Sequence, residues 1–181
     1  MDVDQGDQMQ KSITNLSSWS VEDVEAHMAG LPRGQELERI RVVAQSHVNR
    51  SLEPREVRLR WAKLSLAANK QFHGDEPWSQ TRMRCQEFRL RTWVIEHIGP
   101  DADPDWNPDA LAEDTIAALS LQPGQAEATA ANWRELPIEQ IGVLRRHKNL
   151  TGHIDRLMPS LRPGPIKDQL AAWASVRAHL P

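Results

Sequence analysis

Apolar residues recur at α-helical spacing along most of this 181-residue chain, and this periodicity constrains the fold more than any other feature. After Ser51, for example, apolar side chains stand at positions i, i+4, i+7 and i+11, namely Val57, Trp61, Leu64 and Ala68. No segment alternates apolar and polar residues with the β-branched enrichment of a strand. The sequence therefore predicts an all-α fold, an irregular helical bundle of about six to eight helices with no sheet.

Capping residues and helix breakers divide the pattern into separate helices. Ser20 can cap a helix that Gly30 ends, and Asn107 followed by Pro108 marks the start of another. The expected helices cover residues 20–30, 35–50, 79–98 and 125–135, and residues 138–158 with a break near Asn149. Two further helices begin at Ser51 and at Asn107, and a last helix ends at about residue 179. The predicted organisation is a flexible acidic and polar tail over 1–15, then a single helical domain over 16–181 whose candidate seam is the acidic connector 99–108.

The composition predicts a soluble protein of the cytoplasm. Apolar residues make up 39% of the chain and charged residues 26%, and no apolar run approaches the ~18 residues that cross a bilayer. The first residues are acidic and polar, so we expect no secretory signal. Cys85 is the only cysteine, which excludes an internal disulfide and suits a reducing compartment.

The segment GPDADPDWNPDALAEDT, residues 99–115, places acids at alternate positions, as a calcium-binding loop does: Asp101, Asp103 and Asp105. Such a loop also needs a glycine at its sixth position and a glutamate at its twelfth, where this chain has Trp106 and Ala112. We therefore predict an exposed connector that binds no calcium. We expect no metal and no cofactor elsewhere in the chain.

Basic residues predominate in segments 50–98 and 141–181, and acids predominate between them. Two basic surfaces could therefore exist on an acidic protein, although the charge blocks could equally pair with one another. A nucleic-acid-binding protein is accordingly the first alternative function. Its candidate phosphate contacts are Arg58, Arg84, Arg91, Arg145, Arg146 and Lys148.

The common catalytic motifs are missing from the sequence: there is no phosphate-binding loop, nucleophile elbow or paired-histidine zinc helix. His73, Asp75 and Glu76 cluster in the turn expected before the helix at 79–98, and acid–base chemistry could use such a trio. An enzyme with a polar site around these three is the second alternative, although a solvated turn needs the same residue types. Cys85 is either a small packed residue or a thiol whose pKa is lowered by the arginines near it.

The segment WSVEDVEAHM, which begins at Trp19, resembles the opening of a sterile-alpha-motif domain, a small helical interaction module. The likeness covers about ten residues. The continuation lacks the aromatic spacing and the closing helix of that family, so we do not assign the family.

Seven tryptophans in a helical chain exceed what a modest core needs, and tryptophan is enriched where interfaces concentrate binding energy. Trp78 and Trp106 lie in expected connecting segments, outside the apolar stripes, so we predict that both are exposed and bind a partner. The main functional prediction is a non-enzymatic intracellular interaction or regulatory protein that binds a protein partner. The sequence predicts neither the partner nor the oligomeric state.

Overall fold

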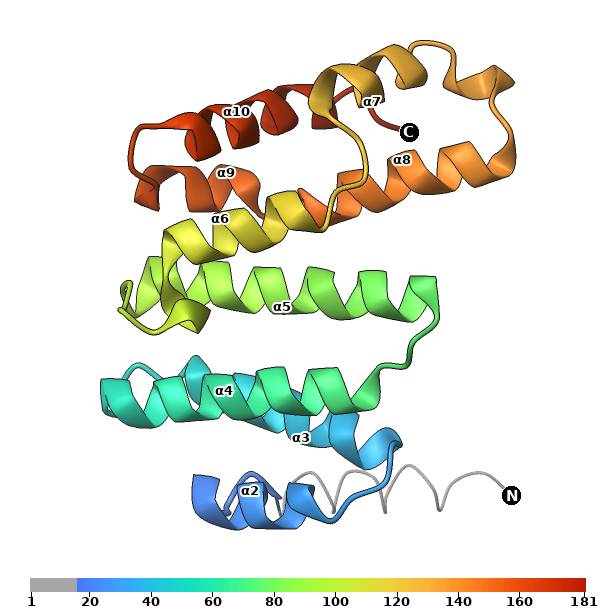
Figure 1. The fold of residues 1–181 in the computed structure, drawn as a ribbon. Helices are drawn as coiled ribbons and strands as arrows, with labels where there is room; N and C mark the ends of the chain where they lie inside the picture. Colours follow the sequence, from blue (N-terminus) through green and yellow to red (C-terminus); the bar gives the residue numbers. More distant parts are fainter. Residues whose placement is uncertain (1–15) are drawn as a thin grey trace, which may run out of the picture. The chain divides into compact units, whose positions relative to one another are not determined.

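A computed structural model describes residues 16–181, and within that range the chain forms α-helices and short 3-10 turns with no strand (Figure 1). The prediction of an all-α helical bundle without a sheet is confirmed. The tail predicted over 1–15 lies outside the described residues. None of the helices in the described range is both long enough and apolar enough to cross a bilayer.

The chain divides into two compact units, the first ending at Met83 and the second beginning at Arg84. The division falls inside helix α5 (Pro77–His97), ahead of the connector 99–108 where the sequence suggested a seam. The expectation of one domain over 16–181 stays a prediction.

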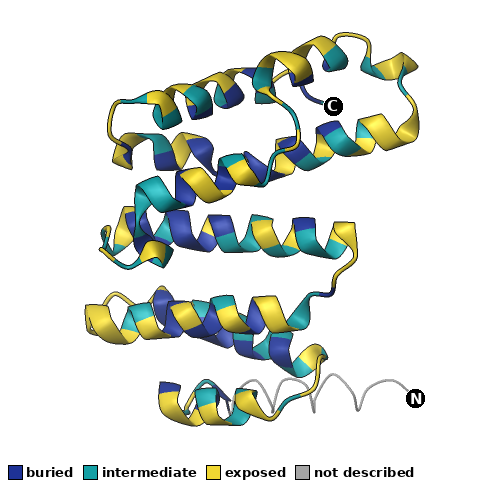
Figure 2. Ribbon diagram, in the orientation of Figure 1, coloured by how far each residue is buried: buried dark blue, intermediate teal, exposed yellow. Residues whose placement is uncertain are grey.

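The first unit contains α2 (Val21–Ala29), α3 (Gln35–Val48), α4 (Arg55–Phe72) and the start of α5. The predicted cap of α2 is present, because Ser20 Oγ accepts a hydrogen bond from Asp23 N at 3.2 Å. Helices α3 and α4 pack along each other, and their buried residues lie where the two helices meet (Figure 2). The predicted apolar stripe of α3 is fully buried there: Leu37, Ile40, Ala44 and Val48.

The second unit contains the rest of α5 and the helices α6 (Pro108–Ala117), α7 (Pro123–Ala130), α8 (Ile138–Leu150), α9 (Ile154–Leu157) and α10 (Pro165–Arg177). Three 3-10 turns separate them, Pro104–Trp106, Trp133–Glu135 and Met158–Ser160. One core joins these elements, and its members include Phe88, Leu111, Leu144, Ile154, Leu170 and Trp173. The break predicted near Asn149 is confirmed, since α8 ends at Leu150.

The acidic connector is an ordered, half-buried turn rather than an exposed segment. Asp101 Oδ1 accepts a hydrogen bond from Asp103 N at 3.3 Å, and Asp103 Oδ1 accepts one from Asp105 N at 3.0 Å. Aspartate side chains commonly bond in this way to backbone N–H groups two residues on. The predicted cap at Asn107 is also present, because its Oδ1 accepts from Asp109 N at 2.9 Å. These contacts give the alternating aspartates a structural role, and the absence of calcium binding stays a prediction.

The predicted exposure of Trp106 is wrong, because only 1% of its surface is accessible. The 3-10 turn that carries Trp106 is held from α5, where the Arg91 side chain donates to the backbone oxygens of Pro104 and Asp105 at 2.9 Å each. These bonds satisfy two carbonyl groups of the turn, which allows the turn to pack its indole inward. Trp106 is therefore a core residue of the second unit.

Candidate functional site

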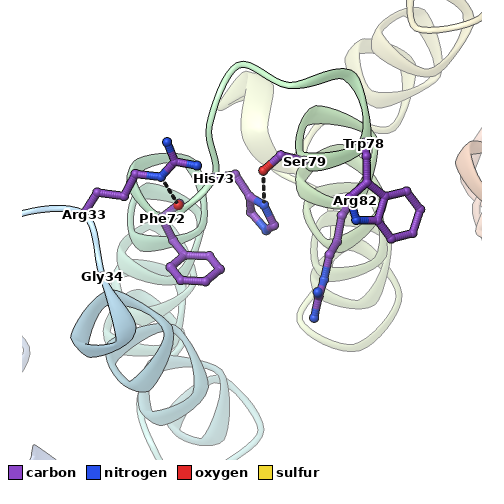
Figure 3. Close-up of a pocket in the computed structure, with 7 residues that line it drawn as sticks. All are labelled: Arg33, Gly34, Phe72, His73, Trp78, Ser79 and Arg82. Atoms are coloured by element: carbon purple, nitrogen blue, oxygen red, sulfur yellow. Dashed lines mark hydrogen bonds between the residues drawn. The ribbon is translucent and has the colours of Figure 1, made fainter.

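The first unit carries a pocket of about 420 Å³ formed by the start of α3, the end of α4 and the start of α5 (Figure 3). It is the candidate functional site because it brings together an exposed aromatic side chain and several charged or polar groups. Its main lining residues are Arg33, Phe72, His73, Trp78, Ser79 and Arg82.

The floor of this pocket is the turn between α4 and α5. Ser79 Oγ accepts a hydrogen bond from Gly74 N at 3.1 Å and lies 3.0 Å from His73 Nδ1. Gln80 Nε2 donates to Gly74 O at 2.6 Å and closes the turn from the other side. Gly74 leaves room for the guanidinium of Arg33, which a Cβ at this position would displace. The turn therefore has a defined shape and holds His73 in place.

Arg33 closes one side of the pocket. Its Nε donates to Phe72 O at 2.8 Å, and Phe72 is the last residue of α4. A cation at this position favourably meets the partial negative charge at the C-terminal end of a helix. A second hydrogen bond joins the segment before α3 to the end of α4, because Gln71 Nε2 donates to Leu31 O at 2.9 Å. The guanidinium of Arg33 is thus a fixed feature of the pocket.

Trp78 lies at the second position of α5 and is 70% exposed. In Figure 3 its indole lies with Arg82 on the side of His73 away from Arg33 and points away from His73. Large apolar side chains this exposed are few among the described residues. The prediction that Trp78 is exposed is confirmed.

The pocket has a positive electrostatic character. Arg33 and Arg82 line it, and no carboxylate is among the lining residues. The pKa of Glu38 is lowered, chiefly by the hydrogen bond from Arg41 and further by the charges of Arg82 and His73. The N-terminal end of α5 adds a partial positive charge. Positive charge next to the exposed Trp78 favours a ligand that carries an anionic group beside an apolar one.

The predicted catalytic trio does not converge on the pocket. His73 lines it, whereas Asp75 and Glu76 are exposed and lie outside its lining. Glu76 instead approaches Arg33 at 3.8 Å. His73 is paired with Ser79, whose hydroxyl already closes the turn by accepting from Gly74 N. The contacts of this turn are those of a structural element.

The predicted phosphate contacts fall into two groups. Arg58, Arg91 and Lys148 are tied to the backbone of their own units, where Arg58 Nε donates to Val48 O at 2.8 Å and Lys148 Nζ donates to Leu180 O at 2.7 Å. Arg91 is only 2% exposed. The second group is Arg84, Arg145 and Arg146; of the six, Arg84, Arg145 and Lys148 are exposed, and Arg58 and Arg146 are half-buried. The six residues are distributed over both units.

Sequence reasoning did not single out Arg33, Phe72 or Ser79 as site residues. Arg33 stands between Pro32 and Gly34 in what reads as a plain linker, and nothing local indicates that it reaches the end of α4. A weak signal existed for Ser79, which follows His73 by six residues across a predicted turn.

Fold and site together define an all-α protein with a small basic pocket beside an exposed tryptophan. No protein-family model matches the chain, and searches of curated proteins and of solved structures also find no match.

Proposed function

We propose that this protein is a helical interaction module that binds a protein partner through the pocket around Trp78. The partner segment it favours carries an apolar side chain next to an acidic one. The single observation that carries the proposal is the 70% exposure of Trp78 at the edge of a pocket lined by Arg33 and Arg82.

The apolar part of the proposal rests on Trp78 and Phe72. Both residues line the pocket, and its volume of about 420 Å³ accommodates one or two side chains of a peptide. An exposed indole held on a rigid helix loses little conformational freedom when it is covered, which is one reason why tryptophan dominates interface energetics.

The acidic part rests on the charges around the indole. Arg82 is exposed, and Arg33 is held in position by its bond to Phe72 O. An arginine can bind a carboxylate through two parallel N–H donors, so a glutamate or aspartate of the partner would find a directional contact. Charge complementarity of this kind also speeds association at low ionic strength.

The experiment is a selection of random peptides displayed on phage against the full chain, with counter-selection on the Trp78→Ala variant. We expect the enriched peptides to combine an acidic residue with an aromatic or branched aliphatic one. A synthetic peptide of that sequence should bind about thirtyfold more weakly to Trp78→Ala and about tenfold more weakly to Arg82→Ala.

Two matched controls are available. Leu52→Ala removes an exposed apolar side chain that does not line the pocket, and Arg84→Ala removes an exposed arginine two positions from Arg82. Both should bind the peptide within about twofold of the unchanged chain. Peptides that bind Trp78→Ala as well as the original chain would contradict the proposal.

The nucleic-acid alternative has a different signature. Oligonucleotide binding that depends on salt would favour that function instead, if Arg84→Ala and Arg145→Ala weaken it and Trp78→Ala leaves it unchanged.

We further propose that the module acts in the cytoplasm, because its one cysteine suits a reducing compartment. We propose a regulatory role for it there.

A further inference from the structure

A buried polar pair lies at the other end of the α3–α4 helix pair. His47, near the end of α3, is 5% exposed, and its Nδ1 lies 2.9 Å from Glu53 Oε1. Its ring stacks on Trp61 of α4 at 4.1 Å between ring centroids. Because an ionised carboxylate only accepts hydrogen bonds, Nδ1 carries the hydrogen in this pair.

Two polar atoms of this pair have no hydrogen-bond partner within residues 16–181. They are His47 Nε2 and Glu53 Oε2, and both are buried. The other carboxylate oxygen, Glu53 Oε1, also accepts from Arg50 Nη1 at 3.4 Å. Buried polar atoms in folded proteins almost always find a partner. Glu53 Oε2 is therefore an unmatched acceptor beside a histidine ring that also lacks a partner at Nε2.

The pair borders a cleft of about 410 Å³ between α2 and α4. Three carboxylates line this cleft, those of Glu22, Glu53 and Glu56, against the single cation of Arg60. Arg60 is itself engaged, because its Nε donates to Glu25 Oε1 at 3.0 Å and its Nη1 contacts Glu22. The cleft therefore keeps a net negative character.

Two indoles complete the lining of the cleft. Trp61 is covered on one face by the His47 ring, and the partly exposed Trp19 lies on the α2 side. An indole face attracts a cation and also covers the aliphatic stem of a basic side chain. Trp61 itself is only 2% exposed, so the carboxylates and the Trp19 indole form the chemical environment suited to an organic cation.

A metal ion fits this cleft less well. No group of three or more metal-binding side chains is present among the described residues. A zinc site takes three or four protein ligands, and His47 with Glu53 supplies two.

We propose that this cleft binds the guanidinium or primary ammonium group of an arginine or lysine in a partner peptide. The carboxylates of Glu53 and Glu56 supply opposite charge and accept its N–H groups, and Trp19 covers the side-chain stem. This site lies at the opposite end of the α3–α4 pair from the Trp78 pocket and has the opposite charge. Its success or failure is independent of the function proposed for that pocket.

The test is a titration of the full chain, followed by two-dimensional NMR at low salt, with a peptide containing one arginine, acetyl-Gly-Arg-Gly-amide. We expect saturable shifts of the indole N–H signals of Trp19 and Trp61. The same peptide with citrulline in place of arginine has the same shape without the charge, and it should bind at least about tenfold more weakly. Agmatine, a free guanidinium compound, should bind more weakly than the arginine peptide.

Variants tie the binding to the cleft. Glu53→Gln should weaken the arginine peptide by about tenfold and Glu56→Gln by several-fold, while Glu139→Gln, at an exposed acid of α8, should leave it within about twofold. Unaltered circular dichroism of Glu56→Gln shows that the fold is kept, and if Glu53→Gln alone loses structure the Glu56→Gln result decides. Equal binding of the citrulline peptide, equal binding of agmatine, or unchanged affinity in Glu56→Gln would overturn the proposal.

Discussion

The guanidinium of Arg91 on α5 lies 2.7 Å from the carboxylate of Asp114 on α6, and it also reaches Glu87 one turn earlier on its own helix at 3.2 Å. Together with its bonds to the carbonyls of Pro104 and Asp105, this side chain joins α5, the acidic connector and α6. Arg91, which the sequence suggested as a phosphate contact, thus connects several elements of the second unit through hydrogen bonds and ion pairs.

Replacing Arg91 by alanine should lower the free energy of unfolding by about 3 kcal/mol, because it leaves two backbone carbonyls of the connector without their donor. Urea unfolding followed by circular dichroism measures this loss. Arg84→Ala, at an exposed arginine of the same helix, should change stability by less than about 0.5 kcal/mol. Equal effects of the two substitutions would show that the Arg91 contacts contribute little.

The two predicted anchor tryptophans should differ sharply in their effect on stability. Trp106→Ala creates a cavity in the second unit and should cost about 3–5 kcal/mol of unfolding free energy. Trp78→Ala removes a mostly exposed ring and should cost less than about 1 kcal/mol. The measurement is the urea midpoint of each variant, and a Trp106→Ala midpoint as high as that of Trp78→Ala would contradict the burial of the Trp106 indole.

Two buried histidines should make the second unit sensitive to acid. His153 Nε2 lies 3.0 Å from Thr115 Oγ1, and burial lowers the pKa of His153 from 6.5 to about 4. His147 Nδ1 donates to Val143 O at 2.7 Å, which leaves Nε2 to accept from Ser120 N at 3.0 Å. Burial lowers the pKa of His147 as well. Both rings are therefore held in the neutral form.

For His153 the unfolded chain takes up a proton near pH 6.5, whereas the folded chain resists it until about pH 4. The stability that this histidine contributes is therefore complete above pH 6.5 and falls as the pH drops toward 4. Between pH 7 and pH 5 the loss should be about 2 kcal/mol. Urea unfolding at several pH values measures the slope, which His153→Gln should reduce and His179→Gln, at an exposed site, should not. A His153→Gln protein with the original slope would refute this origin of the acid sensitivity.

Cys85 should react slowly with thiol reagents. Burial raises the pKa of its thiol, and the charge of Arg89 opposes this effect only in part. The suggestion that neighbouring arginines lower this pKa is therefore wrong, because desolvation outweighs their charge. At pH 8 we expect reaction with Ellman's reagent on the order of tenfold slower than in the urea-unfolded chain. Equal rates in the folded and unfolded chain would place the thiol at the surface.

The sequence by itself determined most of the helices and several of their caps and buried faces, although Val57 of the predicted α4 stripe is 37% exposed and the helix expected over 125–135 ends at Ala130. These features depend on interactions between residues at most a few positions apart. Asn107 caps α6 through the N–H groups that follow it, and the stripe from Leu37 to Val48 recurs with the period of a helix. Such patterns can be read without knowing what packs against them.

Only the tertiary structure decided which connecting residues are buried and which form sites. Trp78 and Trp106 have the same local character, yet Trp106 is buried because Arg91, fifteen positions away, satisfies the turn that carries it. The pocket depends on Arg33 reaching Phe72 O, and the cleft on His47 meeting Glu53 and Trp61. The burial of a side chain and the direction of its polar atoms depend on partners that only the folded chain brings near, and short-range sequence patterns do not record those partners.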